Sequence, residues 1–497
     1  MTTAPTHTVN PDIEETLDPL NWDETRAAAH QMIDDAILRL TSLRDRPLWQ
    51  PMPDHVRAFY TKPAPRQPAP LQELYAELKD NLFPYSMGNI HPRFWGWYMG
   101  AGNFTGALAE FLGAMDGSNL GGGDSAAKAL EIQVVDWIKE LMGFPATASG
   151  TMTSGGSIAN LVCLNVARNA MAGVDVRAHG ITALPKPPRF YASDQAHSSS
   201  QKALEILGLG AAALHIVPTK PDLSMDIAAL DKAIADDSAQ GFKPACVIAT
   251  AGTTNAGSID DIEAIHAICR RENIWFHVDG CIGALLKLSA KHADLVKGIE
   301  KADSLALDPH KWLHAPFNTS CALIRDRELH RNTFALHHAY LEEKPRGIGS
   351  GEFLADYSIE LSRSPMALKV WMSLKQHGSE KFGRLIDQNM VQAQYLASLV
   401  KAAPKLELML APPINIVCFR HRVPSGDEAE TKALNTEIML RLQEQGIAAP
   451  SDTTIQGKHC LRAAIANHRT KREDLDVLVT KVLELGAEIL SELKPQV

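Results

Sequence analysis

A lysine with apolar neighbours directly follows a predicted strand in the middle of the chain. Lys311 lies in the segment DPHKW, 308–312, and the run at 303–307 before it is typical of a buried strand. Ligands of an open α/β sheet bind beyond the carboxyl ends of its strands, so this lysine is directed into the expected crevice. Most lysines are solvated surface charges, but Trp312 and Phe317 predict an apolar setting that lowers the pKa of the amine. Such an amine is nucleophilic toward an aldehyde.

An aspartate ends another predicted strand, 32 residues earlier. Asp279 follows the run at 274–278, and an aspartate in such a place usually forms a turn or caps a helix. Together with a strand-end lysine it has a second interpretation. Pyridoxal 5′-phosphate (PLP) withdraws electrons best when its pyridine nitrogen is protonated, and a buried carboxylate keeps the proton there. Lys311 and Asp279 together predict a PLP site, with the cofactor carried as a Schiff base on Lys311.

A turn of small residues opens a predicted helix in the segment TSGGSIANL, 153–161. The free N–H groups and the dipole of a helix N-terminus attract phosphate, and Gly155 and Gly156 allow close approach. The Ser157 hydroxyl supplies a further hydrogen bond in this interpretation, whereas its ordinary role would be to cap the helix. The segment predicts a phosphate site only in combination with the lysine and the aspartate.

A histidine follows the predicted strand at 189–193, in the segment SDQAHSS, 193–199. A histidine at a strand end is more often structural than catalytic. Beside a PLP site, however, the flat ring of His197 is suited to stack on the pyridine and to orient the substrate carboxylate.

The four segments, in this order, resemble the group II PLP-dependent decarboxylases, the family of aromatic-L-amino-acid decarboxylase. The resemblance covers roughly residues 21–493 and is densest in ATAGTT, NIWFHVD and DPHKW, at 249–254, 273–279 and 308–312. It implies fold type I, PLP as cofactor, and decarboxylation of an L-amino acid to the amine and CO2, with an aromatic substrate favoured. It also implies a homodimer whose active sites are shared between the subunits.

The resemblance assigns a role to each matching residue. Lys311 looks like the Schiff-base lysine, Asp279 like the partner of the pyridine nitrogen, and His197 like the ring stacked on the cofactor. The other cofactor-binding positions that it implies are Gly156, Ser157, Thr254, Cys281, Asp308 and His310. Leu361 and Ser362 correspond to a loop that reaches the phosphate from the other subunit.

Tyr340 lies where the family carries a tyrosine on a mobile catalytic loop. Once the carboxylate has left, Cα must be protonated, and a phenol placed there is a suitable acid. The glycines that follow, Gly347, Gly349 and Gly351, favour a flexible lid. The alternative is an ordinary surface loop with a chance tyrosine.

Several residues depart from the family pattern, and some of them bear on the substrate. Asp308 stands where animal relatives have asparagine, which puts a carboxylate near the phosphate. Gly117 and Asn119 fall where aromatic decarboxylases place bulky apolar side chains. Phe317 and Tyr98 still offer aromatic surface, so an aromatic substrate is favoured and a non-aromatic one stays open.

Other functions use the same framework. An aminotransferase of this fold would fix the substrate carboxylate with an arginine of the small domain, for which Arg462 is the candidate. An oxidative deaminase that forms an aldehyde usually lacks the loop tyrosine or the stacking histidine, and both are present. A catalytically inactive binding protein would have no reason to keep both Lys311 and Asp279. These features favour the decarboxylase.

Alternating strand and helix patterns predict the elements that position these residues. Strands are expected at 189–193, 214–217, 245–250, 274–278, 303–307 and 319–325, with helices at 158–170 and 261–271. The fold class is α/β, a mixed and mostly parallel sheet flanked by helices, in a large domain at 94–376. A small α+β domain is expected at 377–497, with strands at 414–421 and 460–465.

An N-terminal arm, 1–93, carries a helix with Ile33, Ile37 and Leu40 on one face and then a proline-rich strap. A lone helix and a strap have little core of their own, so the arm is expected to pack on the next domain or on a second subunit. The second of these expectations agrees with the implied homodimer.

The composition bears on partners and location. Of 497 residues, 58 are acidic and 49 basic, a net charge of −9, which is not the basic balance of a nucleic-acid-binding protein. The seven cysteines are scattered without C-x-x-C spacing, so neither a disulfide framework nor a metal site is expected and a reducing cytoplasm is favoured. No targeting or membrane segment is apparent, because the most apolar long stretch, 94–115, is interrupted by Asn103 and Glu110.

Overall fold

The computed structural model describes residues 15–336 and 344–492. The chain divides into two compact units, with the boundary between Met87 and Gly88. The second unit holds a seven-stranded and a five-stranded sheet, together with the described residues of the predicted site.

The N-terminal unit is built from helices and short turns. Its α-helices are α1 (Trp22–Thr41), α2 (Asp54–Phe59) and α3 (Leu71–Asn81). The Tyr75 hydroxyl on α3 donates to the Asp35 carboxylate on α1 at 2.8 Å, which ties the two longer helices together. Neither α1 nor α3 buries a residue, and Ile33 and Ile37 are 37% and 40% exposed. The predicted helix is present, and its apolar face is not covered within this unit.

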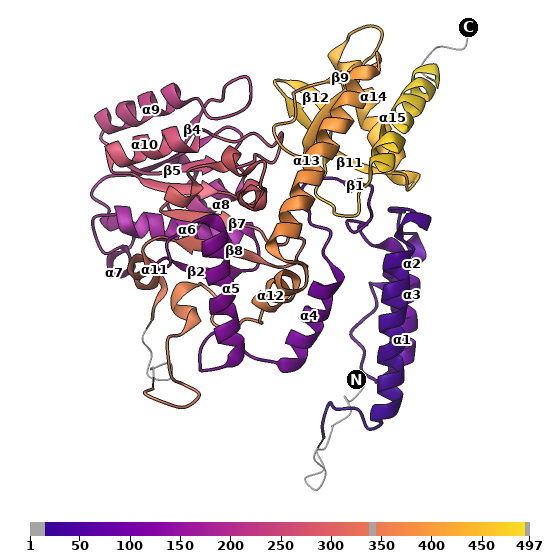
Figure 1. Ribbon diagram of the computed structural model, residues 1–497, viewed down its shortest axis with the longest axis horizontal. Helices are drawn as coiled ribbons and strands as arrows, with labels where there is room; N and C mark the ends of the chain where they lie inside the picture. Colours follow the sequence, from indigo (N-terminus) through magenta and orange to yellow (C-terminus); the bar gives the residue numbers. More distant parts are fainter. Residues whose placement is uncertain (1–14, 337–343, 493–497) are drawn as a thin grey trace, which may run out of the picture. The chain divides into compact units, whose positions relative to one another are not determined.

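The larger sheet lies between helices in the left part of Figure 1. Its strands are, in spatial order, β2 (Ser149–Thr153), β8 (Ser320–Ile324), β7 (Ser304–Leu307), β6 (Trp275–Asp279), β5 (Lys243–Thr250), β3 (Pro188–Ser193) and β4 (Leu214–Val217). Strands β7, β6, β5, β3 and β4 pair in parallel, whereas β8 is antiparallel to both β7 and β2. The predicted mixed, mostly parallel sheet is confirmed.

The strands predicted for this sheet are present, with ends that differ by at most two residues. Strand β2 was not predicted, because small residues and a glycine interrupt its apolar pattern. A Cβ at Gly150 would lie 2.7 Å from the side chains of both Leu323 and Val135. Glycine in this strand therefore lets β8 and a neighbouring helix approach closely.

Helices cover both faces of the larger sheet. One face packs against α6 (Gly156–Met171), α8 (Ser199–Ile206) and α11 (Arg327–Phe334), and the other against α5 (Ala126–Met142), α9 (Ile227–Ala239), α10 (Ile262–Glu272) and α12 (Ala367–His377). Side chains alternate along the strands: in β3, Phe190 joins the apolar cluster under α6 and Tyr191 the cluster of the opposite face. In β6 the same alternation turns His277 and Asp279 toward Asn160 of α6.

The second sheet has five strands and belongs to the C-terminal α+β part. Its order is β1 (Phe94–Trp95), β11 (Ala449–Ile455), β12 (Lys458–Ala464), β10 (Ile416–His421) and β9 (Leu406–Leu408). A separate apolar cluster joins it to α13 (Ser379–Ala402), α14 (Glu428–Glu444) and α15 (Arg472–Glu492). The edge strand β1 comes from residues ahead of the larger sheet and pairs in parallel with β11. The domain boundaries at 93/94 and 376/377 stay a prediction.

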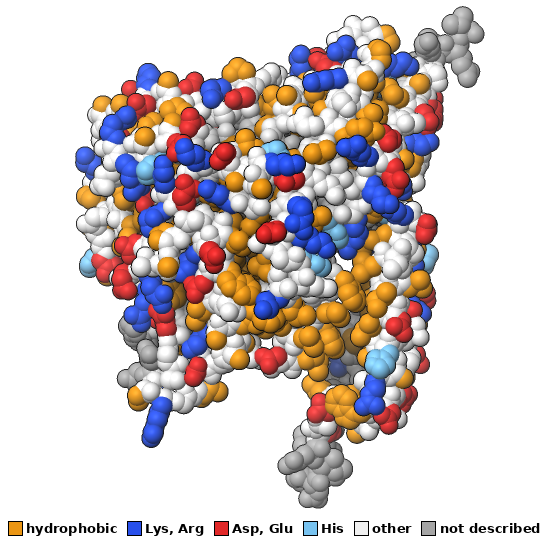
Figure 2. Space-filling model, in the orientation of Figure 1, with side chains coloured by type: hydrophobic (Ala, Val, Ile, Leu, Met, Phe, Trp, Pro, Cys, Tyr) orange, Lys and Arg blue, Asp and Glu red, His pale blue; other side chains and the backbone are white. Residues whose placement is uncertain are grey.

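The described surface and interior bear on partners. Among residues 15–336 and 344–492, no helix is both long and apolar enough to cross a membrane, and no cluster of His, Cys, Asp and Glu is arranged to hold a metal ion. All seven cysteines are free and buried. On the face seen in Figure 2, positive and negative side chains are interspersed over α9 and α10.

Candidate active site

Several of the predicted site residues lie at one edge of the larger sheet. Because β3, β5, β6 and β7 run in parallel, their carboxyl ends lie at the same edge. The segments at these ends carry His197, Thr254, Asp279 and Lys311. Asp279 at the end of β6 pairs with Ala306 of β7. The aspartate therefore lies next to the segment after β7, residues 308–317, which carries Lys311 and is called the lysine loop below. This is the edge at which an open α/β sheet binds ligands.

Lys311 forms an ion pair with Asp308. Its Nζ lies 2.8 Å from Asp308 Oδ2, and the Ser320 hydroxyl donates to the other oxygen of that carboxylate. The lysine side chain is 19% exposed and the aspartate side chain 2%. Burial alone lowers the pKa of Lys311, but the charge of Asp308 outweighs it and the pKa is raised. The predicted lowering of this pKa is wrong, because it took account of the apolar flanks and left out the adjacent carboxylate.

The aromatic residues after Lys311 have different surroundings. Trp312 is fully buried, and its indole N–H donates to Asn389 at 2.9 Å. Phe317 is 41% exposed and packs against the ring of His310, with 4.9 Å between the ring centroids. Burial lowers the pKa of the His310 imidazole. The lysine loop therefore offers one accessible aromatic face, that of Phe317.

Asp308→Asn is expected to shift the pH dependence of cofactor capture toward lower pH. Only the free amine attacks an aldehyde, and the Asp308 carboxylate holds Lys311 as an ammonium. Removing that charge lowers the lysine pKa and yields about 10- to 1000-fold more free amine at a given pH below it. The measurement is the rate at which the protein and added PLP develop visible absorbance as a function of pH. A midpoint that stays at its original pH would contradict this role of the ion pair.

The Asp279 carboxylate is buried and held by two donors. Asn160 Nδ2, from α6, donates to its Oδ2 at 3.1 Å, and the backbone N–H of Cys281 donates to its Oδ1 at 3.2 Å. Asp279 is 5% exposed. A carboxylate fixed in this way can hold a proton on a basic nitrogen that binds at the strand ends.

The start of α6 is suited to bind phosphate. Gly155 occupies the N-cap position without a side-chain cap, so the first N–H groups of the helix have no acceptor within it. A Cβ at Gly156 would lie 2.6 Å from Cys281 Sγ and 2.8 Å from Asp308 Oδ2, so glycine is required there. Ser157 is exposed and is not the cap. Burial raises the pKa of the Cys281 thiol, which stays protonated beside this turn.

His197 and Thr254 lie on the loops after β3 and β5. His197 is exposed, and its Nδ1 is 2.8 Å from the Ser199 hydroxyl. Thr254 is half-buried, and its carbonyl accepts from Arg462 at 2.8 Å. Both loops lie at the same edge of the sheet as Asp279 at the end of β6 and Lys311 after β7, and the imidazole ring is open to a ligand.

Ser362 lies against a different loop of the same chain. Its hydroxyl accepts from Asn119 Nδ2 at 3.1 Å. The carbonyl of Leu361 packs on Gly121, where a Cβ would approach it to 1.9 Å. Asn119, predicted to line the substrate pocket, and Ser362 therefore share one surface. Within the described residues, no hydrogen bond joins Ser362 to the lysine or the aspartate of the strand edge.

Of the two tyrosines with a predicted role in the site, the structure describes only Tyr98. Tyr340 lies outside the described residues. Tyr98 is 6% exposed, and its hydroxyl accepts from Asn415 Nδ2 at 2.9 Å. Its ring meets Trp312 edge-on within the core. The prediction that Tyr98 offers aromatic surface is therefore wrong.

A series of buried side-chain hydrogen bonds next to Asp279 was not predicted. It runs from Trp275 through Ser304 and His277 to Asn160. Asn160 is 1% exposed, and His277 is fully buried. The available signal was a lone asparagine and a lone histidine, each within an apolar run, but nothing in the sequence placed the two side by side.

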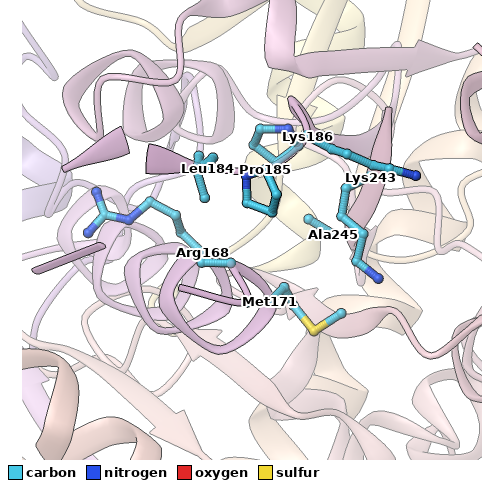
Figure 3. Close-up of a pocket in the computed structure, with 10 residues that line it drawn as sticks. Arg168, Met171, Leu184, Pro185, Lys186, Lys243 and Ala245 are labelled. Carbon is cyan, nitrogen blue, oxygen red and sulfur yellow. The ribbon is translucent and has the colours of Figure 1, made fainter. Parts of the chain in front are cut away.

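A separate cavity lies at the opposite end of the strands (Figure 3). It has a volume of about 160 Å³ and is lined by Pro188 and Lys243, the first residues of β3 and β5. In the close-up, the charged groups of Arg168, Lys186 and Lys243 point away from its apolar centre. None of the predicted site residues lines it, so it is not the candidate active site.

Comparison with protein families and curated proteins places the chain among decarboxylases. Residues 53–422 match the family described as the pyridoxal-dependent decarboxylase conserved domain. Aromatic-L-amino-acid decarboxylase of Bacillus atrophaeus is 32% identical over 480 residues, which cover 95% of this chain and 97% of that protein. L-2,4-diaminobutyrate decarboxylase of Acinetobacter baumannii is 31% identical over 374 residues, 72% of each protein.

Comparison with solved structures bears on the fold. The structure of Oryza sativa TDC with PLP and tryptamine superposes with a TM-score of 0.88 at 24% identity, over 95% of this chain and 100% of that one. Mouse CSAD in apo form gives a TM-score of 0.86 at 24% identity, over 94% and 99%. The prediction of fold type I is confirmed.

Proposed function

The chain belongs to the pyridoxal-dependent decarboxylase family, and on that basis we propose that it removes the α-carboxylate of an aromatic L-amino acid and releases the amine. Its cofactor is pyridoxal 5′-phosphate, and its reaction is a decarboxylation. The observation that carries the proposal is the amine of Lys311 at the strand edge, with the buried Asp279 carboxylate on the neighbouring strand.

The chemistry of the residues at the strand edge fits this cofactor. Lys311 supplies a primary amine for the aldehyde, and Asp279 supplies a buried carboxylate for the pyridine nitrogen. The uncapped start of α6, at Gly156 and Ser157, supplies N–H donors for the phosphate. The other residues proposed to hold the cofactor are His197, Thr254, Cys281, Asp308 and His310, with Ser362 from a second subunit.

The proposed roles follow the order of the reaction. When bound, PLP accepts the electron pair that the departing carboxylate leaves on Cα. Asp279 holds the proton of the pyridine nitrogen in place for that purpose. His197, which is exposed at the strand edge, orients the substrate carboxylate. Tyr340 donates its phenolic proton to Cα after the carboxylate has left.

The aromatic substrate is supported by the names of relatives and by one exposed ring. Relatives that match nearly the whole chain are named as aromatic-L-amino-acid, tryptophan and tyrosine decarboxylases. Phe317 presents an accessible aromatic face beside His310. The small side chains at Gly117 and Asn119, and the L-2,4-diaminobutyrate decarboxylase among the relatives, make a non-aromatic amino acid the second candidate.

A product assay with Tyr340→Phe tests the activity and the proton donor together. The wild-type enzyme is expected to convert aromatic L-amino acids to amine and CO2. The variant keeps the ring but lacks the acidic proton, so it should bind PLP and release CO2 while dioxygen diverts the product toward aldehyde, ammonia and peroxide. Mass spectrometry of the products and a peroxide assay distinguish the two outcomes.

The matched control for this assay is Tyr60→Phe, since Tyr60 is 53% exposed and lies in the N-terminal unit. It is expected to keep the wild-type product. An unchanged amine yield in Tyr340→Phe would mean that Tyr340 is not the group that protonates Cα. Amine formed from L-2,4-diaminobutyrate alone would overturn the aromatic substrate.

The aminotransferase alternative depends on Arg462. Arg462 is 3% exposed and donates to the carbonyls of Thr254 and Asn255 at 2.8 and 3.0 Å. A guanidinium held by backbone carbonyls is poorly placed to bind a substrate carboxylate. This geometry favours decarboxylation over transamination.

We also propose a homodimer with shared active sites and a cytoplasmic location. Helix α4 (Phe104–Asp116) leaves Phe111, Leu112 and Met115 55%, 50% and 68% exposed, and Figure 2 shows hydrophobic side chains gathered over it. Apolar faces of this kind are typical of subunit interfaces. The seven free, buried cysteines support a reducing compartment.

Subunit complementation tests the shared site. Lys311→Ala and Ser362→Glu homodimers should both be nearly inactive, because one lacks the amine and the other places a carboxylate against the phosphate. Purified heterodimers of the two variants should recover about half of the wild-type activity, since one of the two symmetric sites combines an intact Lys311 with an intact Ser362. No recovery in verified heterodimers would mean that each site is built from one chain.

A further inference from the structure

We propose that Asn160 is a positioning residue that fixes the Asp279 carboxylate for the cofactor. The proposal rests on the proposed function, because it concerns the partner of the pyridine nitrogen in the same site. Asn160 lies on α6, is 1% exposed, and connects Asp279 to a buried hydrogen-bond chain through His277 and Ser304. The chemistry of its neighbours determines the direction of every bond in this chain.

The orientation of the Asn160 amide follows from Asp279. A carboxylate oxygen accepts hydrogen bonds, so the amide atom 3.1 Å from Asp279 Oδ2 must be the NH2 group. The amide oxygen is then the atom that lies 2.8 Å from His277 Nε2. The opposite orientation would set two acceptors against each other at Asp279. The amide therefore cannot be flipped without losing the bond to the carboxylate.

The tautomer of His277 follows from Asn160. Because the amide oxygen only accepts, Nε2 of His277 carries the proton and donates to it. Burial lowers the pKa of His277 to about 4, so the ring is neutral near pH 7 and its Nδ1 accepts from the Ser304 hydroxyl at 2.9 Å. The Ser304 oxygen in turn accepts from the indole N–H of Trp275 at 2.9 Å. Donation thus runs in one direction from Trp275 to Asp279.

A second bond prevents the amide from rotating. The other hydrogen of Asn160 Nδ2 points to Ser199 Oγ at 3.3 Å. The Ser199 oxygen must accept it, and its own hydrogen is free to donate to His197 Nδ1 at 2.8 Å. The backbone N–H of Ser199 also donates to that nitrogen. The Asn160 amide is therefore held at its oxygen and at both hydrogens. Because the amide cannot rotate, its bond to Asp279 Oδ2 fixes the position of that carboxylate.

The position of Asn160 on α6 adds a geometric consequence. It follows Gly156 by four residues, which is about one helical turn. The start of this turn is proposed to bind the phosphate, and its end holds the carboxylate for the pyridine nitrogen. One rigid helical turn therefore sets the distance between the N–H groups proposed to bind the phosphate and the amide that holds Asp279 for the pyridine nitrogen.

The test compares Asn160→Leu, which removes the polar atoms at similar size, with Asn160→Asp, which keeps the shape but replaces the donor by an acceptor. Both are expected to weaken PLP binding by about tenfold, the change that corresponds to one lost buried hydrogen bond. Both should also shift the pH dependence of the visible absorbance of the loaded enzyme. A residue that only stabilises the fold would change the melting temperature and leave this pH dependence in place.

A double-mutant cycle identifies the residue through which Asn160 acts. In an Asp279→Ala background, Asn160→Leu should cause little further loss of PLP affinity, because its target is already gone. Asn165→Leu is the matched control on the same helix, since Asn165 Oδ1 accepts from Arg168 at 2.7 Å and, within the described residues, Asn165 has no hydrogen bond to a proposed site residue. It should leave PLP affinity and the absorbance unchanged.

Two outcomes would overturn the proposal. One is a folded Asn160→Leu enzyme with wild-type PLP affinity and pH dependence, and the other is an equal loss of affinity with and without Asp279. If Asn160→Leu does not fold, the same measurements on the isosteric Asn160→Asp decide. PLP affinity is measured without substrate, so a failure of the aromatic substrate proposal leaves this test intact.

Discussion

Lys311→Ala is expected to abolish decarboxylation together with the visible absorbance of the bound cofactor. Lys311 is the amine proposed to bond the aldehyde, and the wild-type rate should fall by at least about 10⁴-fold, equivalent to about 5 kcal/mol. The variant also leaves the Asp308 carboxylate, 2% exposed, without its cation, so a lower melting temperature is expected as well. Absorbance spectra of the purified protein and CO2 release measure the two effects.

Two further variants separate chemistry from stability. Lys311→Arg keeps a cation beside Asp308 but is not a nucleophile, so it should restore the melting temperature and remain inactive. Lys287→Ala is the matched control: Lys287 is 20% exposed and pairs with Glu300 at 2.8 Å, close to the values for Lys311. Normal activity in Lys311→Ala would refute the proposed site.

Asp279→Ala is expected to lower the decarboxylation rate by about 10³-fold, equivalent to about 4 kcal/mol. Without a buried carboxylate the pyridine nitrogen loses its proton, and the cofactor then withdraws electrons poorly. Steady-state release of CO2 by PLP-loaded enzyme measures the loss. A rate within a few-fold of wild type would mean that another group protonates the pyridine.

The control for this prediction must distinguish the lost charge from a damaged core. Asp279→Asn keeps the shape and removes the charge, so it should lose nearly as much activity as alanine. Asp237→Asn removes another buried aspartate, which pairs with His215 on the sheet at 2.8 Å and lies outside the proposed site. That variant should lower stability while leaving the rate per loaded enzyme unchanged.

Much of the sheet could be predicted because apolar runs mark buried parallel strands directly. Strands β6 and β7 follow from the runs at 274–278 and 303–307, and their carboxyl ends carry Asp279 and Lys311. Strand β2 could not be found in this way, because its glycine is set by the approach of residues from two other elements. The pattern of apolar residues in a strand indicates which of its side chains are buried. It does not indicate which distant element packs against them.

The sequence could indicate which residues lie at the strand ends, but it could not indicate how their side chains interact. Asp308 and Lys311 are three residues apart, yet the sequence did not indicate that the carboxylate would pair with the amine and raise its pKa. The contact between Asn160 and Asp279 spans 119 positions and depends on the packing of a helix against a strand. Such contacts follow from tertiary structure, and only the assembled fold reveals them.

The pairing of β2 with the antiparallel strand β8 determines when this part of the sheet can form during synthesis. Among the strands that the structure describes, the edge strand β2 pairs only with β8, and Ser149 lies 175 positions before its partner Ile324. During synthesis β2 therefore emerges long before its partner and waits as an unpaired edge, a state prone to wrong pairing. Because β2 leads directly into the turn before α6, that turn is anchored only after residue 324 has left the ribosome. Strand β2 therefore joins the larger sheet only after the segment that forms β8 has been made.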